Sequence, residues 1–213
     1  GRIPTASETI QYIESKDIRK KQKLITSLIG SEGYVSHQYN WWADILRVNT
    51  RMQGQSPSNG MAYSNWIKGS IRENKSYDNF VRDLITAEGM IDENGAVGFY
   101  LRDRGMELDH LATTAQVFLG TQLVCAQCHD HPFDVWTRKD FYSVAAYFGK
   151  TRRFESNFTR VVYTSEGEQT SVLWPPEDEA EESERKAMVP AFPFPMIDAK
   201  QMPAFIVRYK ALL

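Results

Sequence analysis

Apolar side chains recur at intervals of three and four residues through most of the first 150 positions, which is the spacing of amphipathic helices. Ser, Thr or Asp stands at the start of several of these stretches, and glycine follows some of them, as is typical of helix boundaries. We therefore expect helices that begin near Thr5, Asp17, Ser31, Met61, Ser76, Glu107 and Thr137. Glycines are expected to end three of them, at Gly30, Gly89 and Gly120.

The pattern is different elsewhere in the chain. Residues 53–60 and 90–105 are rich in glycine and polar side chains and predict irregular structure. Two short apolar runs, 159–164 and 169–174, flank a Gly-containing stretch and predict a β-hairpin. Further on, the charged run 177–185 predicts a solvated segment, and the prolines after it predict extended backbone.

The length of 213 residues suits one domain with an appendage. We expect a mainly α fold, with a helical domain over residues 1–150 and a small β-hairpin with an extended segment over 151–213. The net charge of −2 argues against a nucleic-acid-binding protein, which would carry a basic stripe. No apolar run approaches 18 residues, so we expect no membrane-spanning segment. The chain begins with Gly1 rather than Met, which indicates processing or trimming, so the absence of a signal peptide carries no information.

The two cysteines of the chain, Cys125 and Cys128, are followed directly by His129. This CxxCH pattern is the attachment signature of a c-type haem. On a helical turn, positions i, i+3 and i+4 share one face, so two thiols and one imidazole can address a single group. We therefore expect one covalent haem, with thioethers at both cysteines and His129 as the proximal ligand of the iron.

Other interpretations of the motif remain open. A redox dithiol of the thioredoxin kind needs a βαβ context, which the pattern lacks. A zinc site would combine the two cysteines with His129 or His131 and a fourth ligand from His37 or His110. A disulfide across two residues would be strained.

The distal side of the expected haem is less well defined. His37 and His110 are candidate distal ligands, and Met106 is a third, because Met/His ligation occurs in cytochromes c. An open position would instead favour chemistry on a small oxidant. We expect Phe133 and Trp136 to wall the haem. Arg102 and Arg104 are expected to pair with its propionates, which guanidinium groups recognise bidentately.

The stretch 118–148, FLGTQLVCAQCHDHPFDVWTRKDFYSVAAYF, resembles the core motif of the planctomycete-type cytochrome domain of unknown function. The segments YVSHQYNWW, ADILR and GFYLRDRGM are also similar to that family, and the likeness extends over roughly residues 2–150. The resemblance implies a mainly helical fold. It also implies a place in a large secreted protein of Planctomycetes, Verrucomicrobia or related bacteria.

Together these patterns predict a c-type cytochrome domain that transfers electrons in the periplasm or outside the cell. We expect its partners to be a redox protein or other subunits of a larger complex, and we expect a carrier rather than a catalyst. Two alternatives stay open. One is a structural or interaction module whose Cys/Cys/His cluster holds zinc or no metal, and the other is a haem enzyme domain.

Overall fold

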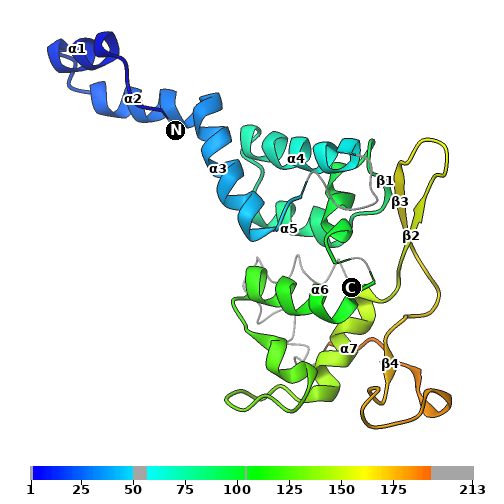
Figure 1. Cartoon of the computed structure of the whole chain (residues 1–213). Helices are drawn as coiled ribbons and strands as arrows, with labels where there is room; N and C mark the ends of the chain where they lie inside the picture. The colour runs from blue at the N-terminus through cyan, green and yellow to red at the C-terminus, as the bar shows by residue number, and fades with distance from the viewer. Residues whose placement is uncertain (1, 50–56, 104, 193–213) are drawn as a thin grey trace, which may run out of the picture.

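Two hydrophobic cores organise the computed structural model, which describes residues 2–49, 57–103 and 105–192 (Figure 1). The α-helices are α1 (Ala6–Glu14), α2 (Lys20–Ile29), α3 (Glu32–Ile45), α4 (Pro57–Arg72), α5 (Tyr77–Ile85), α6 (Glu107–Thr114) and α7 (Arg138–Phe148). Shorter helical turns are η1 (Gly95–Leu101), η2 (Ala115–Leu119), η3 (Leu123–Gln127) and η4 (Glu182–Glu184). The fold is mainly helical, and no helix among the described residues is long and apolar enough to cross a membrane.

The first core lies where α4 and α5 pack against the 3₁₀ helix η1. Ile67, Leu84 and Phe99 are fully buried in it. The approach of η1 to α4 depends on Gly98, because a Cβ atom there would lie only 2.2 Å from the ring of Tyr63. Only glycine fits without a shift of the Tyr63 side chain.

The second core joins α6, α7 and η3. Alanines are frequent among its larger side chains, and Ala126, Ala145 and Ala146 are all fully buried. Small residues let helix backbones approach closely, and Leu123 and Phe141 fill the remaining space. The described structure thus holds two cores stacked one above the other in Figure 1.

Two small antiparallel sheets accompany the helices. Strand β3 (Val162–Glu166) lies between β1 (Gly89–Met90) and β2 (Thr151–Glu155). Strand β4 (Leu173–Trp174) pairs with β5 (Lys186–Ala187). Because Val162 is buried in the first core, the segment after residue 150 completes that core. The domain boundary expected at residue 150 stays a prediction.

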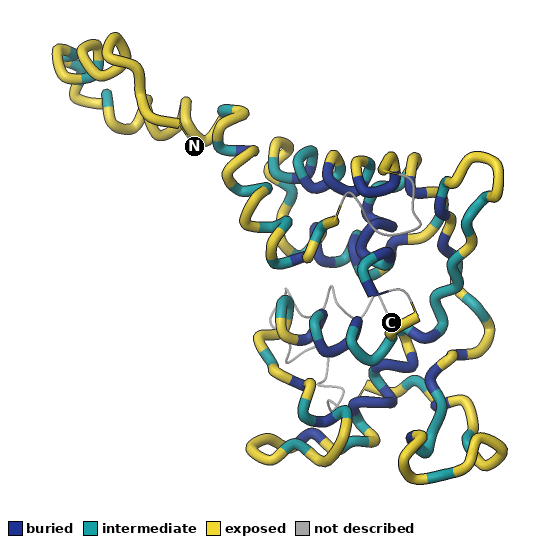
Figure 2. Tube along the Cα trace, in the orientation of Figure 1, coloured by how far each residue is buried: buried dark blue, intermediate teal, exposed yellow. Residues whose placement is uncertain are grey.

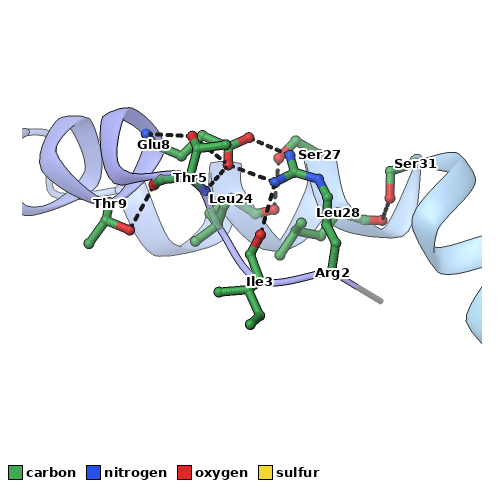
Figure 3. A network of polar contacts seen from close by, with 9 residues as sticks. All are labelled: Arg2, Ile3, Thr5, Glu8, Thr9, Leu24, Ser27, Leu28 and Ser31. Carbon is green, nitrogen blue, oxygen red and sulfur yellow. Dashed lines mark hydrogen bonds and ion pairs between the residues drawn. The ribbon is translucent and has the colours of Figure 1, made fainter.

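Helices α1 and α2 extend away from both cores and contain no buried residue (Figures 1 and 2). Local polar contacts define α1 (Figure 3). The Thr5 hydroxyl accepts a hydrogen bond from the Glu8 N–H at 3.2 Å, and the Glu8 carboxylate accepts one from the Thr5 N–H at 2.7 Å. Arg2 pairs with the same carboxylate. This capping box satisfies N–H groups that the helix itself leaves open.

Several expected helix boundaries are confirmed. Thr5, Ser31, Ser76 and Thr137 each occupy the N-cap position of a helix. The helix that begins at Glu107 continues as a π-helical turn to Leu119 and ends at Gly120 in the left-handed conformation.

Other expectations are wrong. Helix α5 stops at Ile85, so Gly89 does not end it. Gly89 is instead the first residue of strand β1, with a positive φ of 95°. Residues 57–60 begin α4 rather than a loop, and residues 50–56 lie outside the described part of the chain. Helix α2 begins at Lys20 and has no side-chain cap, because Asp17 accepts its hydrogen bond from the Arg19 N–H in the preceding turn.

The hairpin was expected in the right region but with the wrong strands. Strand β3 pairs with β2, which precedes it, and β4 pairs with β5, which follows it. The runs 159–164 and 169–174 therefore do not pair with each other. Their alternation reflects a common property of half-buried strands and does not specify a partner. The expected extended C-terminal segment lies outside the described residues from position 193 onward.

The two capping boxes give a matched test of where stability resides. Thr137 and Asp140 form the same box at α7 as Thr5 and Glu8 form at α1. We expect Thr137→Ala to lower the free energy of unfolding by about 1 kcal/mol, because α7 packs in the second core. Thr5→Ala should leave global unfolding unchanged, since α1 buries nothing. Urea denaturation followed by circular dichroism measures both, and equal losses would contradict the assignment.

Glycine-to-alanine substitutions test the packing of η1 on α4. Gly98→Ala is expected to cost about 1–3 kcal/mol, because the added methyl group overlaps the Tyr63 ring. The matched control is Gly69→Ala in α4, where a Cβ meets nothing within 4 Å. That change should stabilise the protein by up to about 1 kcal/mol through helix propensity. Thermal unfolding of both variants gives the comparison, and a neutral Gly98→Ala would contradict the close approach.

Candidate functional site

The CxxCH motif lies on a 3₁₀ turn that the second core holds by one face. Leu123 and Ala126, three positions apart, are buried in that core. Side chains three apart eclipse one another in a 3₁₀ helix. Cys125 and Cys128, also three positions apart, therefore share a different face of the turn, where the first is half-buried and the second exposed, and both are free thiols.

His129 follows the turn and is exposed. Its Nδ1 lies 2.7 Å from the backbone carbonyl oxygen of Asp130. A carbonyl can only accept, so Nδ1 carries the proton and donates it. In the neutral imidazole this leaves Nε2 as the nitrogen with the free lone pair. Metal-binding histidines commonly use this arrangement, in which the second nitrogen donates to a carbonyl and fixes the ring.

His131 differs from His129 in its hydrogen bonding. Its Nε2 lies 3.2 Å from the carbonyl oxygen of Gln122, and its Nδ1 accepts the N–H of Phe133 at 3.3 Å. Both ring nitrogens are therefore occupied by the backbone. The His131 N–H also donates to the carbonyl of Trp136 at 2.8 Å and closes the loop. His131 is a structural residue of this loop, which leaves His129 as the imidazole available to a ligand.

Arg138, the first residue of α7, connects the motif to a distant part of the chain. Its Nε donates to the carbonyl of Gln127, inside the motif, at 3.1 Å. Its two terminal nitrogens pair with Asp178 and Glu179 at 2.6 Å each. The hydrogen bond to Asp178 is the main cause that raises the pKa of Arg138 above its ordinary value. The backbone N–H of Arg138 donates to the Asp130 carboxylate at 2.8 Å.

Apolar side chains border the motif on its exposed side. Phe133 is 94% exposed and Val135 is 88% exposed, both on the loop closed by His131. Val124, next to Cys125, is 46% exposed. Contiguous apolar patches of this kind mark interaction sites, so these three residues are candidates for contact with a ligand or partner. Trp136 is different, because it is buried in the second core.

The described residues contain no assembled set of zinc ligands. Within residues 2–49, 57–103 and 105–192, no three His, Cys, Asp or Glu side chains lie close enough to hold a metal ion. A structural zinc site normally has four ligands in place. The same finding covers Cys125, Cys128 and His129, whose side chains do not converge on one metal position among the described residues.

Arg102 and His110 belong to a second polar cluster, around the buried carboxylate of Asp103. Arg102 forms an ion pair with Asp103, and Nδ1 of His110 lies 3.2 Å from the same carboxylate. Burial alone would raise the pKa of Asp103, but the hydrogen bonds from His110 and Arg102 outweigh it and lower the pKa to about 2. Burial lowers the pKa of His110, which keeps its imidazole neutral at pH 7.

The structure does not bring this cluster to the motif. The His110 ring contacts Phe148, at the end of α7, with ring centroids 4.8 Å apart. The motif contacts Arg138, at the start of α7. Ten residues of α-helix separate these positions, or about 15 Å. His110 and the motif thus contact opposite ends of α7, and the part of His110 as a distal ligand stays a prediction.

The remaining candidates are also distributed over the molecule. His37 is exposed on α3, on the helices of the first core, and Met106 is about half exposed before α6. Arg104 lies outside the described residues. The sequence interpretation missed Arg138, whose role depends on a contact with residues 40 positions further along the chain. The acidic run 177–185 was the only available signal, and it was interpreted as solvated.

Comparison with known proteins gives one match. A family model described as PSCyt2, protein of unknown function (DUF1549), matches residues 1–153. This is well over half of the chain, so the chain belongs to that family. No curated protein matches the chain significantly. No solved structure does so either.

The Asp103 cluster predicts a pH dependence of stability. The pKa of Asp103 in the folded protein is about 2, below the ordinary value of 3.8. The Asp103 carboxylate therefore contributes stability that is present above pH 4 and is lost as the pH falls toward 2. Asp103→Asn should cost about 3–5 kcal/mol at pH 7, because the buried Arg102 loses its partner. It should also flatten the loss of stability between pH 4 and 2.

Urea denaturation across this pH range measures both effects. Asp92→Asn is the matched control, because Asp92 is exposed and lies outside the cluster. It should behave like the unmodified protein at every pH. An Asp103→Asn variant as stable as this control at pH 7 would refute the buried ion pair as a stabilising group.

Proposed function

We propose that this member of the PSCyt2 family binds one haem covalently and transfers electrons through it. Cys125 and Cys128 would form the thioethers, and His129 would supply the axial nitrogen. The proposal is supported by two free thiols three positions apart on a 3₁₀ turn, next to an imidazole whose Nδ1 lies at hydrogen-bond distance from a backbone carbonyl. Such a haem would supply one-electron redox chemistry by cycling between its ferrous and ferric states.

The local chemistry fits this cofactor. The carbonyl of Asp130 holds the His129 ring in the tautomer that metal binding requires, as second-shell carbonyls do in metal sites. The turn is anchored on its inner face by Leu123 and Ala126, so the thiols stay in place without a disulfide. His131 is occupied by backbone hydrogen bonds and does not compete for the metal.

The exposed apolar side chains give the proposed haem a contact surface. Phe133, Val135 and Val124 would lie against the porphyrin, which needs apolar cover to hold its potential. A cofactor mounted on such a surface keeps an accessible edge, which suits exchange of electrons with a partner protein or a neighbouring subunit. We therefore favour a carrier over a catalyst, with placement outside the cytoplasm, where covalent haem is assembled.

Expression together with haem-attachment machinery tests this function. We expect an intact mass raised by one haem and a haem c spectrum for the reduced protein in alkaline pyridine. Cys125→Ala and Cys128→Ala should each leave a single thioether, and the double variant should carry no covalent haem. Met61→Ala is the control, because Met61 is an exposed residue of α4 and is no candidate ligand, and it should retain the haem in full.

The outcome that would overturn the proposal is a folded protein of unmodified mass with no Soret band. Stoichiometric zinc in that protein, lost in Cys128→Ala, would favour the structural-module alternative. Circular dichroism of each variant separates a lost attachment site from a lost fold.

A further inference from the structure

A second site lies on the helices of the first core. A cavity of about 150 Å³ opens between α3 and the turn that joins α4 to α5. Helix α3 contributes Tyr34, Gln38 and Trp42 at intervals of four, so the three side chains form one stripe. Asn74 and Tyr77 come from the opposite side, at the α4–α5 turn and the first residue of α5.

Aromatic rings form the walls of this cavity and hold one another in place. The ring centroids of Trp42 and Phe80 are 4.8 Å apart, and those of Trp42 and Tyr77 are 6.3 Å apart at an interplanar angle of 30°. Trp66 stacks on Phe80 from behind at 5.1 Å. Tyr77 remains 55% exposed, so this side of the cavity opens to solvent. The result is a preorganised aromatic surface that a ligand can reach.

Polar groups without internal partners face the same region. Among the described residues, the half-buried Gln38 amide has no hydrogen bond within the protein, and neither does the side chain of Asn74. Asn74 is held at the end of α4 with φ of 50°. Each amide offers two donors and one acceptor. A few convergent polar groups among aromatic side chains are typical of small-molecule sites.

The charge of the cavity argues for a neutral ligand. Lys75 lines it, but its Nζ is paired with the carboxylate of Asp83 at 2.6 Å and lies over the ring of Trp66. Lys75 is the only charged residue among the described residues of the lining, so a cationic ligand would meet like charge, and an anionic ligand would have to compete with Asp83 for Lys75. A neutral molecule meets neither penalty.

An ion pair across the helices keeps the walls in register. Arg72, the last residue of α4, binds Glu32, the first residue of α3, through two hydrogen bonds of 2.7 and 2.8 Å. Bidentate pairing of this kind fixes orientation as well as distance. The two elements that carry the cavity are therefore tied together beside it.

We propose that this cavity binds one hexopyranose ring of a neutral carbohydrate. Such a ring combines an apolar C–H face with hydroxyl groups around its edge. The C–H face would lie on Trp42 and Tyr77, and the hydroxyls would bond the amides of Gln38 and Asn74. The volume is smaller than the roughly 300–1,000 Å³ of sites for drug-sized ligands, which suits one ring. The open side at Tyr77 lets an oligosaccharide continue beyond it.

The test is titration of the protein with glucose, galactose, xylose, N-acetylglucosamine and the β-linked tetramer of glucose, followed by saturation-transfer NMR and calorimetry. We expect saturable binding of at least one sugar, tighter for the tetramer than for glucose alone. Tyr77→Ala and Gln38→Ala should each weaken it by at least about tenfold, the loss of one good contact. Both side chains are partly exposed, so the variants are expected to fold, and circular dichroism checks this.

Tyr147→Ala is the matched control, because Tyr147 is a partly exposed tyrosine on α7, outside the cavity. It should bind as the unmodified protein does. The proposal is overturned if no sugar in the panel binds saturably, or if binding survives both cavity variants unchanged. Tighter binding of tetramethylammonium than of any sugar would also overturn it. None of these outcomes depends on the haem proposal, since the cavity and the CxxCH motif belong to different cores.

Discussion

The joint between the two cores depends on one buried imidazole. The His110 ring contacts Phe99, from the first core, with centroids 4.6 Å apart, and Phe148, which packs on the second, at 4.8 Å. It also stacks on Tyr100 at 5.1 Å. Each helical group could bury its own apolar face, but their relative position rests on contacts such as these. Because the ring is neutral and hydrogen-bonded through Nδ1, it serves as an aromatic side chain with a fixed orientation.

That orientation depends in turn on a buried charge. The buried carboxylate of Asp103 forms an ion pair with Arg102 and a hydrogen bond with His110. Without these partners, a charged carboxylate in this position would be strongly unfavourable. Arg47, at the end of α3, approaches its other oxygen at 3.7 Å. Residues from three segments thus converge on one carboxylate. A cluster of this kind contributes less net stability than apolar packing would, but it permits few alternative arrangements of the segments it joins.

Local features of the fold could be predicted from the sequence, and long-range ones could not. Caps such as Thr137 and the left-handed Gly120 act on their own neighbours, so a short window contains the whole signal. Strand pairing does not work in this way. Strand β3 finds its partners at β1 and β2, and nothing in its own alternating pattern distinguishes these from β4. The cavity on α3 is equally long-range, because Gln38 and Asn74 meet only through the packing of α3 on α4.

The candidate motif lies between these two cases. Its residue types and spacing were visible in the sequence, and the structure places both thiols on one face. The 3₁₀ helix ends at Gln127, but the His129 N–H still donates to the Cys125 carbonyl at 3.4 Å, so His129 stays within one helical turn of Cys125. That His129 shares the face of the two cysteines stays a prediction, whereas the burial of Ala126 accounts for the position of the cysteines themselves. A residue between the two cysteines must point into the second core, and a repeat of three places Leu123 and Ala126 inward while Cys125 and Cys128 point outward.

The same constraint determines what kind of site the motif can be. With Leu123 and Ala126 committed to the core, the turn leaves Cys128 exposed and Cys125 half-buried. The haem that we propose there would be held by attachment and by the exposed side chains of the following loop, not by enclosure. The Arg138 contacts to Gln127, Asp178 and Glu179 then matter because they fix the base of the turn from behind. Rigidity in this site comes from the scaffold beneath the motif, which leaves its outer side open to a partner.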